Sequence, residues 1–191
     1  QWKKRWAGFS LVEIVIAIAV IGIMSAASVP LIKSTLDKSK NSRAKSELEE
    51  VRNAAVSFYG DTFQLPGAKA CSGTGVPGYM NTDKAAVTAG TATASGTLDD
   101  LDDHFNTNCN GKAAGSNYTD SSLGGAWRGP YMEANRLDPW QESYILIKGA
   151  YNSTSPGIAM STGTDLKLDT KTDGTATDLG TGDVGLLVKL Q

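Results

Sequence analysis

The apolar residues of this chain are concentrated near its amino end. Residues 9–32 are almost uninterruptedly apolar, a run of about 24 positions that is long enough to cross the hydrocarbon core of a membrane as a helix. Lys3, Lys4 and Arg5 precede the run, and Lys33 follows it. Because the denser basic cluster predicts the cytoplasmic end, we expect a single-pass segment with everything after Lys33 outside the cytoplasm.

Helical periodicity continues beyond the apolar run, through about Tyr59. Apolar residues recur at steps of three and four, at Ala44, Leu48, Val51, Ala55 and Phe58. Arg43 with Glu47, and Lys45 with Glu49, stand four residues apart and are expected to pair on the outer face. The sequence therefore predicts one long helix, apolar all round in its first half and amphipathic in its second.

The remainder of the chain predicts a small sheet. Residues 68–125 are rich in Gly, Ala, Ser, Thr and Asn, and are expected to form a long surface excursion. Turn signals and β-rich runs then predict strands at 127–132, 138–147, 150–151, 157–160 and 184–190. The predicted fold class is α+β, with an antiparallel sheet covering the amphipathic second half of the helix.

Charge and composition argue against two classes of function, nucleic-acid binding and catalysis. The 191-residue chain has a formal net charge of -2 and no dense basic face beyond its first residues, so nucleic-acid binding is not expected. Its one histidine lies beside a run of carboxylates, and the chain has no Gly-x-Ser-x-Gly elbow. Such adjacent carboxylates are typical of a solvated face, so we expect the whole group at the surface: Asp99, Asp100, Asp102, Asp103 and His104. We therefore expect a protein that is not an enzyme.

Two cysteines, Cys71 and Cys109, lie well beyond the apolar run. An even cysteine count in an exported chain favours one disulfide between them, and a pair of unrelated buried thiols is the alternative. A zinc site is not expected, because His104 is the only histidine.

One carboxylate, that of Glu13, interrupts the apolar run close to its start. A charged group at such a depth costs a few kcal/mol, on the order of 2.5 or more, unless it finds a partner, so Glu13 is a candidate functional residue. An ordinary secretory signal peptide, cut near the small residues 25–28, is the alternative interpretation of this segment. The length of the apolar run and the carboxylate within it argue against that alternative.

A short motif surrounds this carboxylate. Residues 8–13 read Gly-Phe-Ser-Leu-Val-Glu, and the aliphatic run that follows contains Gly22 and Pro30. The segment resembles the class III signal of type IV pilins and type II secretion pseudopilins. The resemblance implies a pilin-like fold in which residues 9–32 are a transmembrane and filament-core helix and residues 33–191 are a periplasmic or extracellular globular domain.

The resemblance also assigns roles to single residues. It implies that prepilin peptidase cuts between Gly8 and Phe9, so that residues 1–8 are a leader peptide and the new terminal Phe9 is N-methylated. It implies further that Glu13 is the assembly glutamate. Physically, the amine created on Phe9 can neutralise the Glu13 carboxylate of a neighbouring subunit inside an apolar filament core.

The implied partners follow from assembly. They are further copies of this chain in a helical homopolymer, the prepilin peptidase, an inner-membrane assembly platform and other minor pilins or pseudopilins. The implied location is the inner membrane before assembly and a periplasmic or extracellular filament afterwards.

The sequence leaves open two interpretations within the class of pilin-like filament subunits and one outside that class. The elements Gly129-Pro130-Tyr131 and Asp138-Pro139-Trp140 resemble those of the major pseudopilin of type II secretion, which favours a secretion pseudopilus. A type IV pilin for adhesion, motility or DNA uptake is the first alternative, and only DNA uptake would involve nucleic acid. A membrane-anchored periplasmic binding module is the alternative from another class.

The carboxy-terminal loop offers candidate metal ligands. Its aspartates lie among glycines and threonines, giving hard oxygen donors on a flexible segment. The major pseudopilins that this chain resembles bind calcium in this loop, which implies Asp173, Asp178 and Asp183 as ligands. An acidic, solvated loop without a metal is the alternative.

Overall fold

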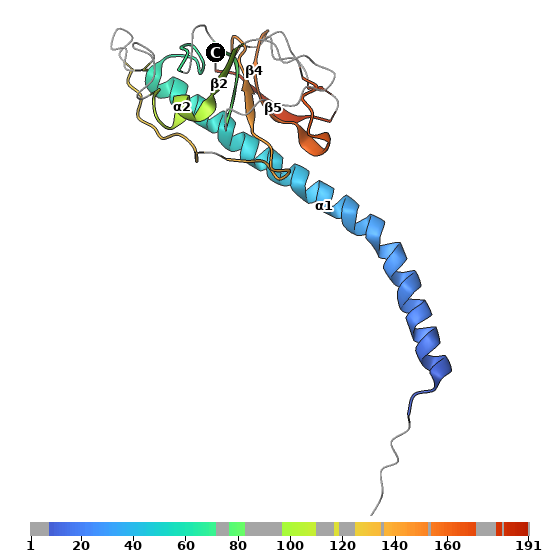
Figure 1. Cartoon of the computed structure of the whole chain (residues 1–191). Helices are drawn as coiled ribbons and strands as arrows, with labels where there is room; N and C mark the ends of the chain where they lie inside the picture. Colours follow the sequence, from blue (N-terminus) through green and yellow to red (C-terminus); the bar gives the residue numbers. More distant parts are fainter. Residues whose placement is uncertain are drawn as a thin grey trace, which may run out of the picture. The chain divides into compact units, whose positions relative to one another are not determined.

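The computed structural model describes residues 8–71, 77–82, 97–109, 117–118, 125–134, 136–152, 154–170, 179–180 and 182–190. The side chains of residues 27, 29–31 and 97 also lie outside the described part. The chain divides into two compact units, Gln1–Ser39 and Lys40–Gln191, each of which is described by itself. The elements follow the order α1, β1, β2, α2, β3, β4, η2, β5 (Figure 1).

The long helix α1 extends over Leu11–Thr62, a total of 52 residues, and contributes to both units. The prediction of one long helix is therefore confirmed, with an end slightly beyond Tyr59. The helix ends where the hydroxyl of Thr62 donates to the Phe58 carbonyl at 2.7 Å and Phe63 adopts a left-handed φ of 52°. A left-handed residue directly after the last turn is a common way to stop a helix.

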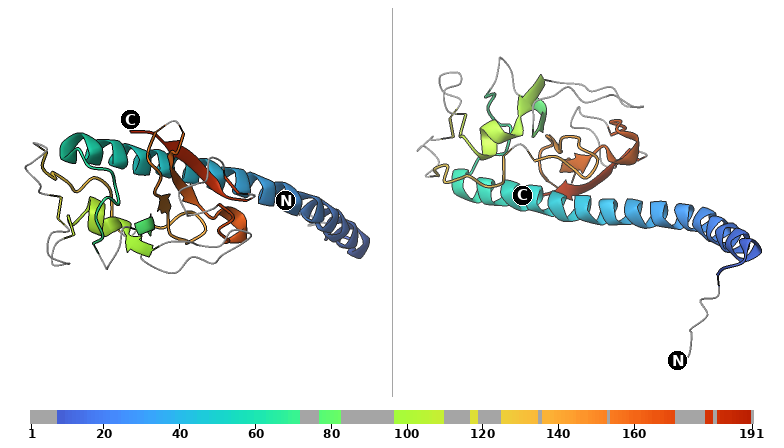
Figure 2. Two further views of the ribbon diagram at one scale, coloured as in Figure 1. Left: turned by 90° about the horizontal axis from the view of Figure 1, so that it is seen from above. Right: turned by 60° about the horizontal axis from the view of Figure 1, so that its bottom comes forward.

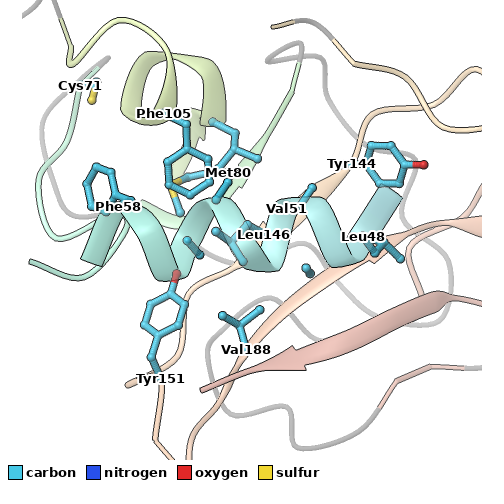
Figure 3. Packing of buried hydrophobic residues seen from close by; sticks show 14 of the residues in the cluster. Leu48, Val51, Phe58, Cys71, Met80, Phe105, Tyr144, Leu146, Tyr151 and Val188 are labelled. Atoms are coloured by element: carbon cyan, nitrogen blue, oxygen red, sulfur yellow. The ribbon is translucent and has the colours of Figure 1, made fainter. Parts of the chain in front are cut away.

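The apolar stripe predicted on the second half of α1 forms the core of the second unit. Its members Ala44, Leu48, Val51, Ala55 and Phe58 are each 0% exposed. From Leu48 onward they pack against side chains from the sheet and its connections, including Met80, Leu146, Tyr151 and Val188 (Figure 3). Each fully buried large apolar side chain contributes about 1.5–3 kcal/mol, so this stripe holds the sheet on the helix.

Glu47, which was predicted on the outer face of α1, is buried. Arg43 and Glu47 do pair, with Nε and Oε1 2.8 Å apart, but Glu47 is only 7% exposed. The prediction of an outer, solvated position is wrong for Glu47, because the Tyr144 hydroxyl donates to its second oxygen and covers it. Glu49 pairs with Arg52 at 2.8 Å, three residues along the helix.

The second unit contains a five-stranded mixed sheet in the order β2-β1-β3-β4-β5. Pairs β1·β3, β3·β4 and β4·β5 are antiparallel, whereas β1·β2 is parallel. The strands and α2 lie along the part of α1 that belongs to this unit (Figure 2). The strand bounds are Pro77–Asn81 for β1, Thr97–Asp100 for β2, Ile145–Ile147 for β3, Gly157–Ser161 for β4 and Val184–Val188 for β5.

Both faces of the central strands are buried. Because side chains alternate along a strand, Leu146 of β3 and Ala159 of β4 face the helix and belong to the main core. Their neighbours form a second cluster on the opposite face, closed by Leu168, which follows the short 3₁₀ helix η2 at Gly163–Asp165. That cluster is made of Tyr79, Ile145, Ile147, Ile158, Met160 and Leu168.

Three expectations for this unit need correction. The stretch 68–125 is more than a surface excursion, because it contains β1, β2 and the short helix α2, Leu101–Phe105. The expected strand at 150–151 is absent from the described structure, since Tyr151 has a positive φ of 53° and points into the core. Residues 127–132 form no strand either. At Gly129 a Cβ atom would lie 2.5 Å from the Trp127 ring, so no residue with a side chain fits in place of this glycine. The strands at 157–160 and 184–190 are confirmed with small shifts.

Candidate functional site

The predicted processing residues lie directly before α1. Gly8 and Phe9 have no regular secondary structure, and the helix begins with the Ser10 carbonyl accepting from Ile14 N at 3.2 Å. Phe9 is 78% exposed, and no described atom lies within 4 Å of a Cβ built on Gly8. Within its own unit, the peptide bond between Gly8 and Phe9 is therefore accessible.

Glu13 lies in the first turn of α1 and is exposed within the first unit. The unpaired amide groups of a helix start favour negative charge nearby, so this position stabilises the carboxylate. Phe9 precedes Glu13 by four residues. Cleavage after Gly8 would thus create a positive amine close to a negative carboxylate, both at the same end of one helix.

Apart from Glu13, the side chains from Leu11 to Met24 present an apolar surface around the helix. Its large apolar side chains range from 47% exposed at Ile14 to 79% exposed at Leu11. Soluble monomers rarely expose a contiguous apolar patch larger than roughly a few hundred Å², so such a surface needs a cover. We define the apolar segment by its members Leu11, Val12, Ile14, Val15, Ile16, Ile18, Val20, Ile21, Ile23, Met24 and Ile32.

The apolar segment is shaped for close packing. A shallow depression on it is lined by Ile21, Met24, Ser25, Ser28 and Ile32. The Ser28 hydroxyl donates to the Met24 carbonyl at 2.8 Å, so this polar group is satisfied within the helix and leaves the depression apolar in character.

Among the residues that the structure describes, no helix has the length and apolarity that crossing a membrane requires. The predicted span 9–32 includes residues 27 and 29–31, whose side chains lie outside the described part. The membrane-spanning role of this segment stays a prediction.

A buried polar cluster lies beside the core of the second unit. Cys71 and Cys109 form a disulfide with Cα atoms 5.0 Å apart, which confirms the predicted pairing. His104 adjoins it, with Nδ1 3.4 Å from Cys71 Sγ and Nε2 3.1 Å from Asp99 Oδ2. The Tyr118 hydroxyl lies 2.7 Å from Nδ1, and burial raises the pKa of this phenol, which keeps it a neutral hydrogen-bonding group. All five residues are 0–1% exposed.

The prediction that this acidic run with its histidine lies at the surface is wrong. The short helix α2 turns the run inward, because Asp100 caps it by accepting from Asp102 N at 2.9 Å while Leu101 and Phe105 are fully buried. Exposure is only 0–8% for Asp99, Asp102, Asp103 and His104.

In the carboxy-terminal loop, the structure describes one of the three predicted calcium ligands. Asp183 Oδ2 accepts from the Thr170 hydroxyl at 2.6 Å and from Asp169 N at 3.1 Å. Its Oδ1 is buried and has no hydrogen-bond partner among the described residues, and burial raises the pKa of this carboxyl. Asp173 and Asp178 lie outside the described residues.

Comparison with known proteins bears on the amino-terminal site. The family described as the prokaryotic N-terminal methylation motif matches residues 4–29, which include Gly8, Phe9 and Glu13. The type IV major pilin protein PilA of Myxococcus xanthus is 34% identical over 61 residues. The type II secretion system core protein G of Pseudomonas aeruginosa is 30% identical over 64 residues. The amino-terminal third of the chain is therefore similar to a type IV pilin and to a type II secretion protein, and it carries the methylation motif.

The likeness of the chain to those relatives is limited in extent. The matched stretches are 32% and 34% of this chain and cover 28% and 45% of the two relatives. The chain thus spans less than half the length of the curated relatives it matches. No solved structure matches it. One relative is named as a major pilin and the other as a core protein of type II secretion.

Sequence reasoning located the amino-terminal site and missed the buried cluster. Gly8, Phe9 and Glu13 are close in sequence, so a local motif reveals them. The buried cluster has no such signal, because His104 is 33 residues from Cys71 and 14 from Tyr118. Only the fold brings these side chains together.

Proposed function

We propose that this chain is a structural subunit of a type IV pilin-like filament, made as a membrane-anchored precursor and cut between Gly8 and Phe9. The observation that carries the proposal is the apolar segment of α1, exposed around the whole helix, with Glu13 in its first turn. The methylation-motif match over residues 4–29 supports the same assignment.

The apolar segment explains why such a subunit would polymerise. Its exposed side chains need either lipid or protein around them, and lipid serves before assembly. Afterwards, equivalent helices from neighbouring subunits replace the lipid and fill depressions such as the one at Ile21, Met24 and Ser28. Tight side-chain packing, rather than transfer out of water, is then what favours the filament over the membrane state.

Glu13 gives that assembly its register. A carboxylate among apolar side chains is costly alone, but the amine of a processed Phe9 on a neighbouring subunit is a partner of opposite charge. Two subunits out of step would leave both charges unpaired. Pairing therefore selects one axial stagger between neighbours.

Processing is tested by intact mass and amino-terminal sequencing of protein recovered from membranes and from sheared filaments of its native host. A chain that begins at Phe9 with one added methyl group supports the proposal. A chain cut near residues 25–28, or an uncut chain, contradicts it and returns the protein to the secreted or anchored class.

Assembly is tested with Glu13→Ala, which should be processed normally but should form few filaments. The matched control is Glu49→Ala, which removes a carboxylate of the same helix that is 50% exposed and paired with Arg52. Filament yields are compared by shearing and electron microscopy. Normal filaments from Glu13→Ala would sink the pairing role, whereas a monomeric wild-type protein in detergent and in cells would favour a membrane-anchored binding module.

We place the filament in type II secretion, with a type IV pilus for adhesion, motility or DNA uptake as the alternative. The match to core protein G supports the first, and the match to PilA supports the second. The partners in either case are the prepilin peptidase, an inner-membrane assembly platform and minor pilins or pseudopilins. Deleting the gene distinguishes the two: loss of secreted enzymes from the medium indicates a pseudopilus, and loss of long surface filaments indicates a pilus.

We further propose that the carboxy-terminal loop binds calcium through Asp173, Asp178 and Asp183. The support is the buried Oδ1 of Asp183, an oxygen with no hydrogen-bond partner among the described residues. A hard divalent cation is the natural partner for such a carboxylate oxygen. Calorimetric titration with calcium, with magnesium as comparison, tests the idea on wild type, Asp183→Asn and the exposed control Glu133→Gln. Absence of calcium binding and of any thermal shift in the wild type would refute it.

A further inference from the structure

The disulfide lies beside a buried histidine, His104, and a buried carboxylate, Asp99, which a disulfide does not require. One atom each from Cys71, Cys109 and His104 lie within 4.8 Å of one another, and all three residues are buried. Nothing in the amino-terminal processing or assembly proposal uses this cluster. Two thiolates and one imidazole are, however, a frequent donor set for zinc.

We propose that, when the disulfide is reduced, Cys71, Cys109 and His104 bind one zinc-class divalent ion. The two distances from Cys71 Sγ to the imidazole nitrogens of His104 are 3.4 and 3.5 Å. In a tetrahedral site with Zn–S about 2.3 Å and Zn–N about 2.0–2.1 Å, a sulfur and a nitrogen ligand lie roughly 3.5 Å apart. The separation of Cys71 Sγ from His104 Nδ1 is thus close to that of two zinc ligands, and because Nε2 is almost equally near, the ring must turn for Nδ1 to face the ion.

The neighbours of His104 suit this role as well. Nε2 lies 3.1 Å from Asp99 Oδ2, and the same oxygen accepts from Cys71 N at 2.7 Å, which fixes the carboxylate. A metal-bound histidine commonly donates its other N–H to a carboxylate, which orients the ring and increases its basicity. Asp99 is therefore a positioning residue, and Nδ1 is the ligand atom.

Tyr118 is hydrogen-bonded to the proposed ligand atom. Its hydroxyl lies 2.7 Å from His104 Nδ1 and must move aside when the ion binds that nitrogen. Three protein donors with one further position is the arrangement of zinc sites that retain a water. The phenol would donate to, or accept from, that water after leaving Nδ1.

Metal binding and the disulfide exclude each other. A dithiol reductant supplies two electrons, and two protons come with them, so that the S–S bond breaks into two thiols while the reductant becomes a disulfide. The ion then binds the two thiolates, and the two thiol protons go to solvent. The oxidised chain therefore offers no thiolate, and binding is gated by the redox state of Cys71 and Cys109.

The direct test uses the full chain in mild detergent, oxidised or reduced with a dithiol that is then removed. Cobalt is the probe, because thiolate-bound Co²⁺ gives charge-transfer bands in the near ultraviolet, and zinc is added afterwards to displace it. The reduced chain should bind one cobalt with these bands and lose them to zinc, while the oxidised chain shows none. A reduced, folded chain without the bands overturns the proposal.

Variants separate a built site from thiols that bind metal anywhere. Cys71→Ser and His104→Ala should each abolish the bands, Asp99→Asn should weaken binding about 10- to 100-fold, and Glu133→Gln, an exposed carboxylate elsewhere, should have no effect. If reduction unfolds the chain, zinc should restore the circular dichroism of the oxidised form. Failure of that rescue, or equal cobalt binding in urea, overturns the proposal.

Discussion

Tyr144 donates its phenolic hydrogen to the carboxylate of Glu47, a residue 97 positions earlier in the chain. The other oxygen of this carboxylate accepts from Arg43 Nε at 2.8 Å. Tyr144 leads directly into β3, and Glu47 lies on the buried face of α1. This hydrogen bond therefore fixes the position of the central strands along the helix, in addition to the apolar packing beside it.

Tyr144→Phe tests the contribution of that hydrogen bond. It removes the donor but leaves the buried carboxylate, which loses a partner, so the free energy of unfolding should fall by about 1–3 kcal/mol. Urea unfolding of the full chain in mild detergent measures the change. Tyr59→Phe, which changes a half-buried tyrosine on α1, is the control and should change stability by less than about 0.5 kcal/mol. Equal effects of the two variants would contradict the assigned role.

The same carboxylate predicts a specific response to acid. Burial raises the pKa of Glu47, but the hydrogen bonds from Tyr144 and Arg43 and the charge of Arg43 outweigh burial, so the net shift is below the ordinary value of 4.5. A folded-state pKa below the unfolded one means that this contribution is fully present above about pH 4.5 and is lost as pH falls through the folded value. Thermal unfolding as a function of pH should show the loss in wild type.

Glu47→Gln isolates this contribution. The variant should be less stable than wild type near neutral pH, and its stability should decline less steeply on acidification, because the titrating group is absent. Parallel pH profiles for wild type and variant would show that other carboxylates control the acid response.

Breaking the disulfide should destabilise the second unit. Cys71 and Cys109 are 38 residues apart, and in the chain-entropy model a loop of that size contributes about 4 kcal/mol. The double variant Cys71→Ala with Cys109→Ala should therefore lower the free energy of unfolding by about that amount, measured by denaturant unfolding with a chelator present. An unchanged midpoint would indicate that the unfolded chain gains little freedom from the lost link.

The sequence predicted the helical core well because its signal is local. Ala44, Leu48, Val51, Ala55 and Phe58 repeat with the period of a helix, and one buried face follows from that period alone. Gly8, Phe9 and Glu13 were found for a similar reason, because they form one short contiguous motif. Whether that motif acts as proposed is a matter for the processing and assembly experiments.

Contacts between residues that are distant in the chain could not be predicted from the sequence. Strands β1 and β2 lie in a stretch of small and polar residues; β1 pairs with the distant strand β3 on one side and with β2 on the other, which local propensity does not indicate. His104 follows a run of aspartates, so charge patterning predicted exposure. Burial of Leu101 and Phe105 in the core overrides that pattern and takes the histidine inward.

Asp183 is expected to respond to pH in the opposite direction from Glu47. Burial raises the pKa of its carboxyl above the ordinary value of 3.8, so the folded state binds a proton more tightly than the unfolded state does. Its contribution to stability is therefore present at low pH and declines as pH rises through the folded value.

Asp183→Asn removes the buried charge and keeps an oxygen for Thr170, so without calcium the variant should be at least as stable as wild type near neutral pH. If the loop binds calcium, saturating calcium should reverse the order, because only the wild-type carboxylate gains the cation. Thermal unfolding of both proteins with calcium and with a chelator measures this crossover, and an unchanged order of stability would leave Asp183 without a role in cation binding.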